Sequence, residues 1–173
     1  MKHLQTARLM IIPCCPADRA DFMALERDPE VMRFLNGGYA VDHGQDAVET
    51  TFLMPRGTEP YVWTVRRRAT GSFVGWFCLW SEDGKVAELG YRLSRAEWGK
   101  GLASEGGSAL VDWGFRSARY EQIVACTMAV NQASRRVLEK IGFRHVRTEQ
   151  VDWADAIPGG NEGEVHYTLT QTA

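Results

Sequence analysis

The chain has 173 residues and a formal net charge of −2 at pH 7. We expect residues 1–173 to form a single domain, because this length suits one domain with a substantial core. The charge balance gives no general attraction to nucleic acid or to an anionic membrane, so we expect neither as a partner. The sequence has no signal-peptide pattern and no apolar run of about 20 residues, the length that a spanning helix requires. We therefore expect a soluble, cytoplasmic protein.

The N-terminal part predicts a strand, a helix and a less regular segment. Arg8 to Ile12 reads as a strand that Pro13 ends, and a helix begins near Ala17 with acidic residues close to its start. Residues 36–39 read as a loop, and residues 42–53 as a second, short helix.

The middle of the chain predicts three strands joined by two hairpins. The strands cover 61–67, 72–80 and 86–93, and the connections at 69–71 and 81–85 have the residue types of tight turns. Strands joined in this way pair antiparallel.

The second half alternates between strands and helices. We expect helices over 101–118 and 132–141 and strands over 122–129, 143–152 and 164–170. The predicted fold is α+β, with a mixed, mostly antiparallel central sheet of about seven strands flanked by about four helices.

The turn between the third hairpin strand and the next helix is the strongest local motif. Glycine at 99 and 101, with Ala103, lets backbone approach a ligand closely, and the helix that follows directs unpaired N–H groups and its positive dipole end at an anion. Lys100 adds a positive charge at the rim. The spacing matches neither a P-loop nor the Gly-x-Gly-x-x-Gly dinucleotide motif. Taken alone, the glycine pair fits a tight turn as well as it fits a phosphate site.

A second motif lies about thirty residues on, where Asn131-x-x-Ser134 is followed by Lys140-x-Gly142-Phe143. Together with Trp98 to Ala103, this pattern resembles the GCN5-related N-acetyltransferase (GNAT) superfamily, whose acyl-CoA loop has the form Gln/Arg-x-x-Gly-x-Gly/Ala. The opening segments Thr6-Ala7-Arg8-Leu9 and Asp28 to Leu35 resemble the branch that acetylates ribosomal-protein N-termini at alanine or serine.

The resemblance implies the GNAT acyl-CoA N-acyltransferase fold and an enzyme that transfers acetyl from acetyl-CoA to a primary amine by direct attack. It implies acetyl-CoA as cosubstrate, no metal, and a monomer or homodimer. The four cysteines agree with the absence of a metal, since they have no Cys-x-x-Cys spacing and no nearby histidine at ligand spacing. The acceptor is a protein or peptide N-terminal amine or a small-molecule amine. A non-catalytic acyl-CoA-binding module of the same fold is the alternative.

The resemblance also assigns residues to the coenzyme. The pantetheine arm is expected in a gap between the strand ending at Leu93 and the one ending near Val130, with a bulge at 91–93 freeing backbone groups there. The expected coenzyme-binding residues are Tyr91, Arg92, Leu93, Trp98, Gly99, Lys100, Gly101, Leu102, Ala103, Ser104, Asn131 and Ser134.

Three chemical tasks follow from direct attack. Glu88 is the candidate base for the amine proton, although a glutamate at a strand edge is more often a partner in a surface ion pair. The N–H of Leu93 or of Tyr91 is positioned to stabilise the developing oxyanion. Ser134 is the candidate acid for the leaving thiolate; water protonating the thiolate remains the other possibility.

Four positions depart from the family pattern. Leu138 stands where many members have a catalytic tyrosine, and Cys126 where some have a catalytic glutamate. Ile12 replaces a common arginine, and Trp98 opens the acyl-CoA loop in place of Gln or Arg.

For the acceptor side, the resemblance points to Phe34, Tyr39 and the 36–42 loop. Simple packing explains any one of these residues equally well. An open acidic groove would suit a basic peptide or polyamine, and a closed aromatic pocket, including Trp80, would suit a small molecule.

Overall fold

The computed structural model describes residues 3–38, 61–151 and 157–171. Within these ranges the strands form one mixed sheet in the order β1-β2-β3-β4-β5-β6-β8-β7. The strands are β1 (Leu4–Gln5), β2 (Leu9–Pro13), β3 (Val62–Arg67), β4 (Phe73–Trp80), β5 (Val86–Leu93), β6 (Gln122–Met128), β7 (Arg144–Glu149) and β8 (Glu164–Thr170). The α-helices of the described residues are α1 (Arg19–Arg27), α2 (Pro29–Asn36), α4 (Leu102–Trp113) and α5 (Gln132–Lys140).

This architecture confirms the predicted mixed, mostly antiparallel sheet with flanking helices. The structure adds the two-residue strand β1 to the seven that were predicted, and β7 ends at Glu149 rather than at residue 152. It also adds α2, which is capped by the Asp28 carboxylate accepting from the Glu30 N–H at 3.0 Å, with Pro29 at its first position. The helix expected over 42–53 lies outside the described residues.

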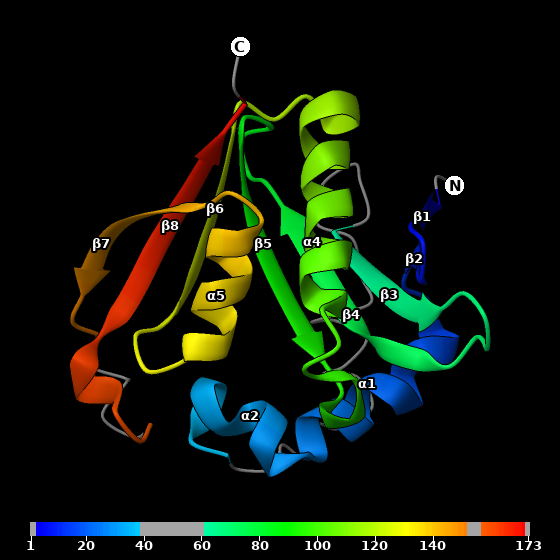
Figure 1. Cartoon of the computed structure of the whole chain (residues 1–173), viewed down its shortest axis with the longest axis horizontal. Coiled ribbons are helices and arrows are strands. Elements are labelled where there is room, and N and C mark those ends of the chain that lie inside the picture. Colours follow the sequence, from blue (N-terminus) through cyan, green and yellow to red (C-terminus); the bar gives the residue numbers. More distant parts are fainter. Residues whose placement is uncertain (1–2, 39–60, 152–156, 172–173) are drawn as a thin grey trace.

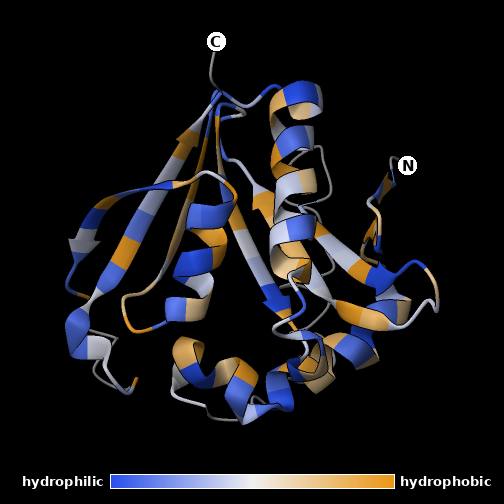
Figure 2. Ribbon diagram, viewed as in Figure 1, coloured by the Kyte–Doolittle hydropathy of each residue, from blue (hydrophilic) through white to orange (hydrophobic). Residues whose placement is uncertain are grey.

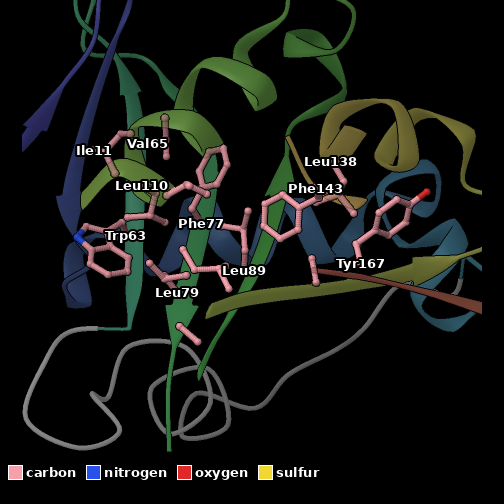
Figure 3. Packing of buried hydrophobic residues seen from close by; sticks show 14 of the residues in the cluster. Ile11, Trp63, Val65, Phe77, Leu79, Leu89, Leu110, Leu138, Phe143 and Tyr167 are labelled. Carbon is pink, nitrogen blue, oxygen red and sulfur yellow. The ribbon is translucent and has the colours of Figure 1, made fainter. Parts of the chain in front are cut away.

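Helices cover the two faces of the sheet. On one face, α4 and α5 pack over a core in which successive strands contribute every second side chain (Figure 3). The residues labelled in Figure 3 are Ile11, Trp63, Val65, Phe77, Leu79, Leu89, Leu110, Leu138, Phe143 and Tyr167. On the other face, a smaller cluster joins Phe22 and Leu25 of α1 and Val31 of α2 to Val62 and Trp76.

The period-two pattern is plain in β8, which alternates between hydrophilic and hydrophobic residues in Figure 2. Val165 and Tyr167 are buried in the core under α5, while Glu164 and His166 point to the opposite face. The close approach of α4 to the sheet requires Gly106, because a Cβ there would lie 2.8 Å from Cζ of Phe77.

The sheet splits between its two central strands. β5 and β6 run parallel and pair only from Val86–Gln122 to Glu88–Val124, although β5 continues to Leu93 and β6 to Met128. Figure 1 shows the two strands close together near the C-terminus and separated at the other end, where α2 lies.

The predicted bulge at 91–93 is wrong. The β4–β5 register runs without a shift from Gly75–Leu93 to Trp80–Glu88, and the irregularity lies one strand away, between Val65 and Arg66. The split arises instead because β5 stays paired with β4 to its end, and β6 stays paired with β8 from Gln122 to Met128. Each strand follows its outer neighbour, so the pair separates.

Candidate active site

A cleft of about 660 Å³ occupies the split. Its walls come from β5, β6, α2, α5 and the turn before α4. This volume lies within the range of small-molecule and cofactor sites, which is about 300–1,000 Å³.

The glycine turn forms one end of the cleft. Gly99 and Gly101 both have left-handed backbone conformations, with φ of +71° and +74°, and α4 begins at the next residue, Leu102. Gly99, Gly101 and residues 102–104 all line the cleft. Helix geometry leaves the N–H groups of this first turn without intrahelical acceptors, so they are available to an anion.

The N-terminal motif of the chain anchors this turn. The backbone N–H and Nε of Arg8 donate to the Glu105 carboxylate at 2.9 and 2.6 Å, and the Thr6 hydroxyl donates to the same carboxylate. Arg8 also donates from its guanidinium to the carbonyl oxygen of Lys100 at 2.9 Å. The Thr6-x-Arg8 pattern therefore joins the start of the chain to the start of α4.

Lys100 differs from the expectation for it. Its side chain is not among the residues that line the cleft, and its Nζ lies 3.0 Å from the Glu97 carboxylate. Arg67 bonds the same carboxylate, and this bond, supported by Lys100, holds the pKa of Glu97 below its ordinary value. The positive charge predicted at the rim is thus paired with an acid.

Trp98 does line the cleft, with 45% of its surface exposed. Its indole Nε1 donates to the carbonyl oxygen of Leu93 at 2.9 Å, which ties the turn to the end of β5. This bond fixes an aromatic wall beside the split.

Beyond its last pair with β6, one edge of β5 faces the split. The Ser94 N–H donates to the carbonyl oxygen of Val74 on β4 at 2.9 Å. The backbone groups of successive residues point alternately to the two edges of a strand. The backbones of Tyr91 and Leu93 therefore face the split, beyond the last residues at which β5 pairs with β6. The N–H groups of Tyr91 and Leu93 therefore point toward the split without a bulge, and their role as donors stays a prediction.

Two predicted coenzyme residues meet across the split. The hydroxyl oxygens of Tyr91 on β5 and Ser134 on α5 lie 3.0 Å apart, and burial raises the pKa of Tyr91 to about 12. Asn131 caps α5, its Oδ1 accepting from the Ser134 N–H at 3.2 Å. All three residues line the cleft.

Glu88 lies at the last position where β5 pairs with β6, opposite Val124. Its side chain is on the face of the sheet opposite to Tyr91, and it lines the cleft. The Cys126 thiol donates to Glu88 Oε1 at 3.8 Å. Burial, followed by the charges of Glu164 and Glu88, raises the pKa of the Cys126 thiol to about 12. The thiol is therefore neutral near pH 7 and unsuited to act as a nucleophile.

Glu164 on β8 is a cleft residue that sequence reasoning missed. It pairs with Met128 on β6, and its carboxylate lies 3.5 Å from Nε2 of His166. Its place beside Cys126 follows from β8 pairing with β6, which local sequence patterns do not encode. Arg136 and Lys140, which line the cleft from α5, were missed as well.

Arg92 lies on the same face as Glu88, away from α5. Its guanidinium donates to the Glu26 carboxylate of α1 at 2.6 Å and lies 5.0 Å above the Trp76 ring. It lines the cleft, but from the side of α1 and α2.

Of the two acceptor-side residues, Phe34 on α2 lines the cleft and packs with Met128 and Ile157. Tyr39 lies outside the described residues. Trp80 does not line the cleft; it lines a second pocket, of about 330 Å³, that shares Glu88 with the first.

In the described ranges, no three or more histidine, cysteine, aspartate or glutamate side chains are grouped to hold a metal ion. None of the helices in those ranges combines the length and the apolar character needed to cross a membrane.

Comparison with known proteins identifies the family. A model of the acetyltransferase (GNAT) domain matches residues 8–144. The FsC-acetyl coenzyme A-N(2)-transacetylase of Aspergillus fumigatus is 34% identical over 178 residues, covering 97% of this chain and 76% of that protein.

Two solved structures share the fold. A spermidine N-acetyltransferase from Vibrio cholerae, in complex with CoA and spermine, has a TM-score of 0.81 at 15% identity, covering 96% of this chain and 97% of that one. A candidate ribosomal-protein-serine acetyltransferase from Vibrio cholerae has a TM-score of 0.74 at 16% identity, covering 98% of each chain. At these identities the likeness shows the fold alone, and membership of the ribosomal-protein branch stays a prediction. The family model and the Aspergillus relative establish the family: the chain belongs to the GNAT acetyltransferases and is an acetyl-CoA-dependent enzyme that acetylates an amine.

Proposed function

We propose that the protein acetylates a primary amine of a small molecule, with acetyl-CoA bound along the split between β5 and β6. The observation that carries this proposal is the cleft itself, which is lined by the glycine turn, by the part of β5 beyond its last pair with β6, and by Glu88. The turn takes the pyrophosphate at residues 99–104, and the edge of β5 pairs with the pantetheine amides. Arg136 and Lys140 add positive charge to the coenzyme side.

The small-molecule acceptor is favoured over a protein N-terminus by the Aspergillus relative, whose name assigns its acetylated group to an N2 nitrogen. Two carboxylates, Glu88 and Glu164, face the acceptor side of the cleft, and Phe34 supplies an aromatic wall. Carboxylates attract an ammonium group, and the aromatic wall excludes water from its neighbourhood.

In this proposal Glu88 takes a proton from the ammonium, directly or through water, since an ammonium has no lone pair for attack. The nitrogen then attacks the thioester carbonyl, whose oxygen accepts from the N–H groups of Tyr91 or Leu93. The neutral Cys126 thiol takes no covalent part.

The test is release of free CoA thiol from acetyl-CoA in the presence of an amine panel. The panel contains amino acids and their derivatives with a free α-amine, polyamines, and peptides that begin with alanine or serine. Turnover with the small amines and not with the peptides supports the proposal, and the reverse preference contradicts it.

Glu88→Gln then tests the base. We expect kcat to fall about 10²- to 10⁴-fold, the range of a positioned general base, while acetyl-CoA affinity measured by calorimetry stays unchanged. Glu121→Gln changes an exposed acid just before β6; it is the matched control and should leave both quantities unaltered. An unchanged kcat in Glu88→Gln removes Glu88 from the mechanism.

The non-catalytic module remains the second candidate, because Leu138 and Cys126 stand where the family resemblance implies a catalytic tyrosine and a catalytic glutamate. It predicts acetyl-CoA binding in calorimetry with no thiol release from any amine in the panel.

A further inference from the structure

The hydroxyl groups of Tyr91 and Ser134 form a bridge across the split that no sequence motif anticipated. Tyr91 reaches from β5 to α5, its oxygen 3.0 Å from Ser134 Oγ and 3.5 Å from the Ser134 carbonyl oxygen. The ring packs against Phe77, with centroids 5.4 Å apart, so the hydroxyl is held in place by the core. Both residues line the cleft.

The helix side of the bridge is equally fixed. Ser134 lies in the first turn of α5, where Asn131 accepts from its N–H at 3.2 Å. One turn later, on the same side of the helix, Leu138 is buried and offers no hydroxyl.

We propose that Tyr91 is a positioning residue for Ser134: the phenol donates to Ser134 Oγ, which turns the serine O–H toward the sulfur of the leaving CoA. The inference rests on the proposed function, since it places the thioester in the split between these two residues and Glu88. A serine hydroxyl can accept from one group and donate to another at the same time, as this arrangement requires.

The chemistry balances without a proton leaving either hydroxyl. As the amine nitrogen bonds to the carbonyl carbon and the C–S bond breaks, the electron pair moves to sulfur, and Ser134 donates a hydrogen bond to the thiolate. The thiolate later takes its proton from water. Direct transfer from Tyr91 is unfavourable by roughly three powers of ten, because the pKa of this phenol is about 12 and that of an ordinary thiol is about 8.5.

The pKa of the CoA thiol in its complex with the protein tests this role. It is read from the ultraviolet absorbance of the thiolate as pH is raised, in the wild type and in Tyr91→Phe. A hydrogen bond to a charged acceptor favours the charged form, so we expect Tyr91→Phe to raise the pKa of the bound thiol by about one unit. Ser134→Ala should raise it at least as much, and Ser134→Thr, which keeps the hydroxyl, should stay close to wild type.

Tyr167→Phe is the matched control. This buried tyrosine on β8 also bonds α5, through Glu139 and Arg135, but does not line the cleft. It should leave the thiol pKa unchanged. CoA lacking its sulfur should bind wild type and Tyr91→Phe with the same affinity, because the proposed contact is made only to sulfur.

The outcomes separate the two proposals. If CoA binds and Tyr91→Phe leaves the thiol pKa at its wild-type value, the positioning role is wrong and the proposed function stands. If neither CoA nor its sulfur-free analogue binds the wild type, the proposed function fails first. In steady-state assays the positioning role predicts an approximately tenfold lower kcat in Tyr91→Phe with an unchanged KM for acetyl-CoA; a change in KM alone would contradict it.

Discussion

Replacing Glu105 by alanine should both destabilise the protein and weaken coenzyme binding, because this carboxylate holds the start of α4 to the N-terminal segment. It accepts from the Thr6 hydroxyl and from the backbone N–H and Nε of Arg8, with 18% of its side chain exposed. Arg8 is 47% exposed, so the ion pair itself contributes only about 0–1 kcal/mol. The remaining bonds to a mostly buried carboxylate, together with its favourable place at a helix N-terminus, bring the expected loss to about 2–3 kcal/mol.

The assay is urea denaturation at neutral pH, repeated toward acid pH. For a chain of this length the loss corresponds to a melting temperature lower by about 5–10 °C. Glu121→Ala, which removes an exposed partner of Lys85, is the control and should change stability by less than about 0.5 kcal/mol.

The pH dependence has a definite sign. Burial raises the pKa of Glu105, but the hydrogen bonds from Thr6 and Arg8 outweigh it and leave the pKa below its ordinary value of 4.5. The stabilisation is therefore present above pH 4.5 and is lost as pH falls through the lower pKa of the folded state. A loss no larger than that of the control, or a difference from wild type that persists undiminished in acid, would refute this account of the anchor.

Two further variants test the glycine turn and the acceptor face. Gly101→Leu should weaken CoA binding about tenfold or more in calorimetry. Gly71→Leu is the control: its φ of +72° is similar and its side chain would enter open space, so it carries the same backbone strain of about 1–2 kcal/mol and should leave CoA affinity intact. Equal CoA affinities of the two variants would contradict the phosphate assignment. Glu26→Gln should lower the free energy of unfolding by about 3 kcal/mol in urea denaturation, because it removes the carboxylate that pairs with the buried guanidinium of Arg92. Adding Arg92→Met should recover part of that loss. A double variant as unstable as the single one would show that the ion pair is not the cause.

The parts of the fold that were predicted depend on local patterns. Strand alternation and turn residues identified the hairpins from β3 to β5, and the glycines at 99 and 101 marked the strand-to-helix turn whose conformations the structure has. The helix α2 was missed although its signal was present, since Asp28 followed by Pro29 is a typical helix start.

The contacts that were not predicted join residues far apart in the sequence. Glu164 reaches the cleft because β8 inserts between β6 and β7, and Tyr91 meets Ser134 because β5 and β6 each follow a different neighbour. Propensity and spacing describe each strand separately, whereas these contacts depend on strand order. The predicted bulge failed for the same reason, since it sought a local cause for a split that strand pairing produces.

Side chains along β5 alternate between the two faces of the sheet, so the candidate catalytic and coenzyme residues of this strand lie on opposite faces. Glu88 and Arg92 occupy even positions and face α1 and α2, while Leu89, Tyr91 and Leu93 occupy odd positions and face α4 and α5 or the core between them. Under the proposed function, the acceptor and the coenzyme approach the split from opposite faces and meet only where β6 has separated. It follows that substitutions at Phe34 or Glu164 should alter which amine is acetylated, with little effect on the interaction with CoA. Substitutions at Ser134 should alter the interaction with CoA without altering which amine is acetylated. In this arrangement one coenzyme site can serve different acceptors, because the residues that recognise the amine belong to a different layer of the fold.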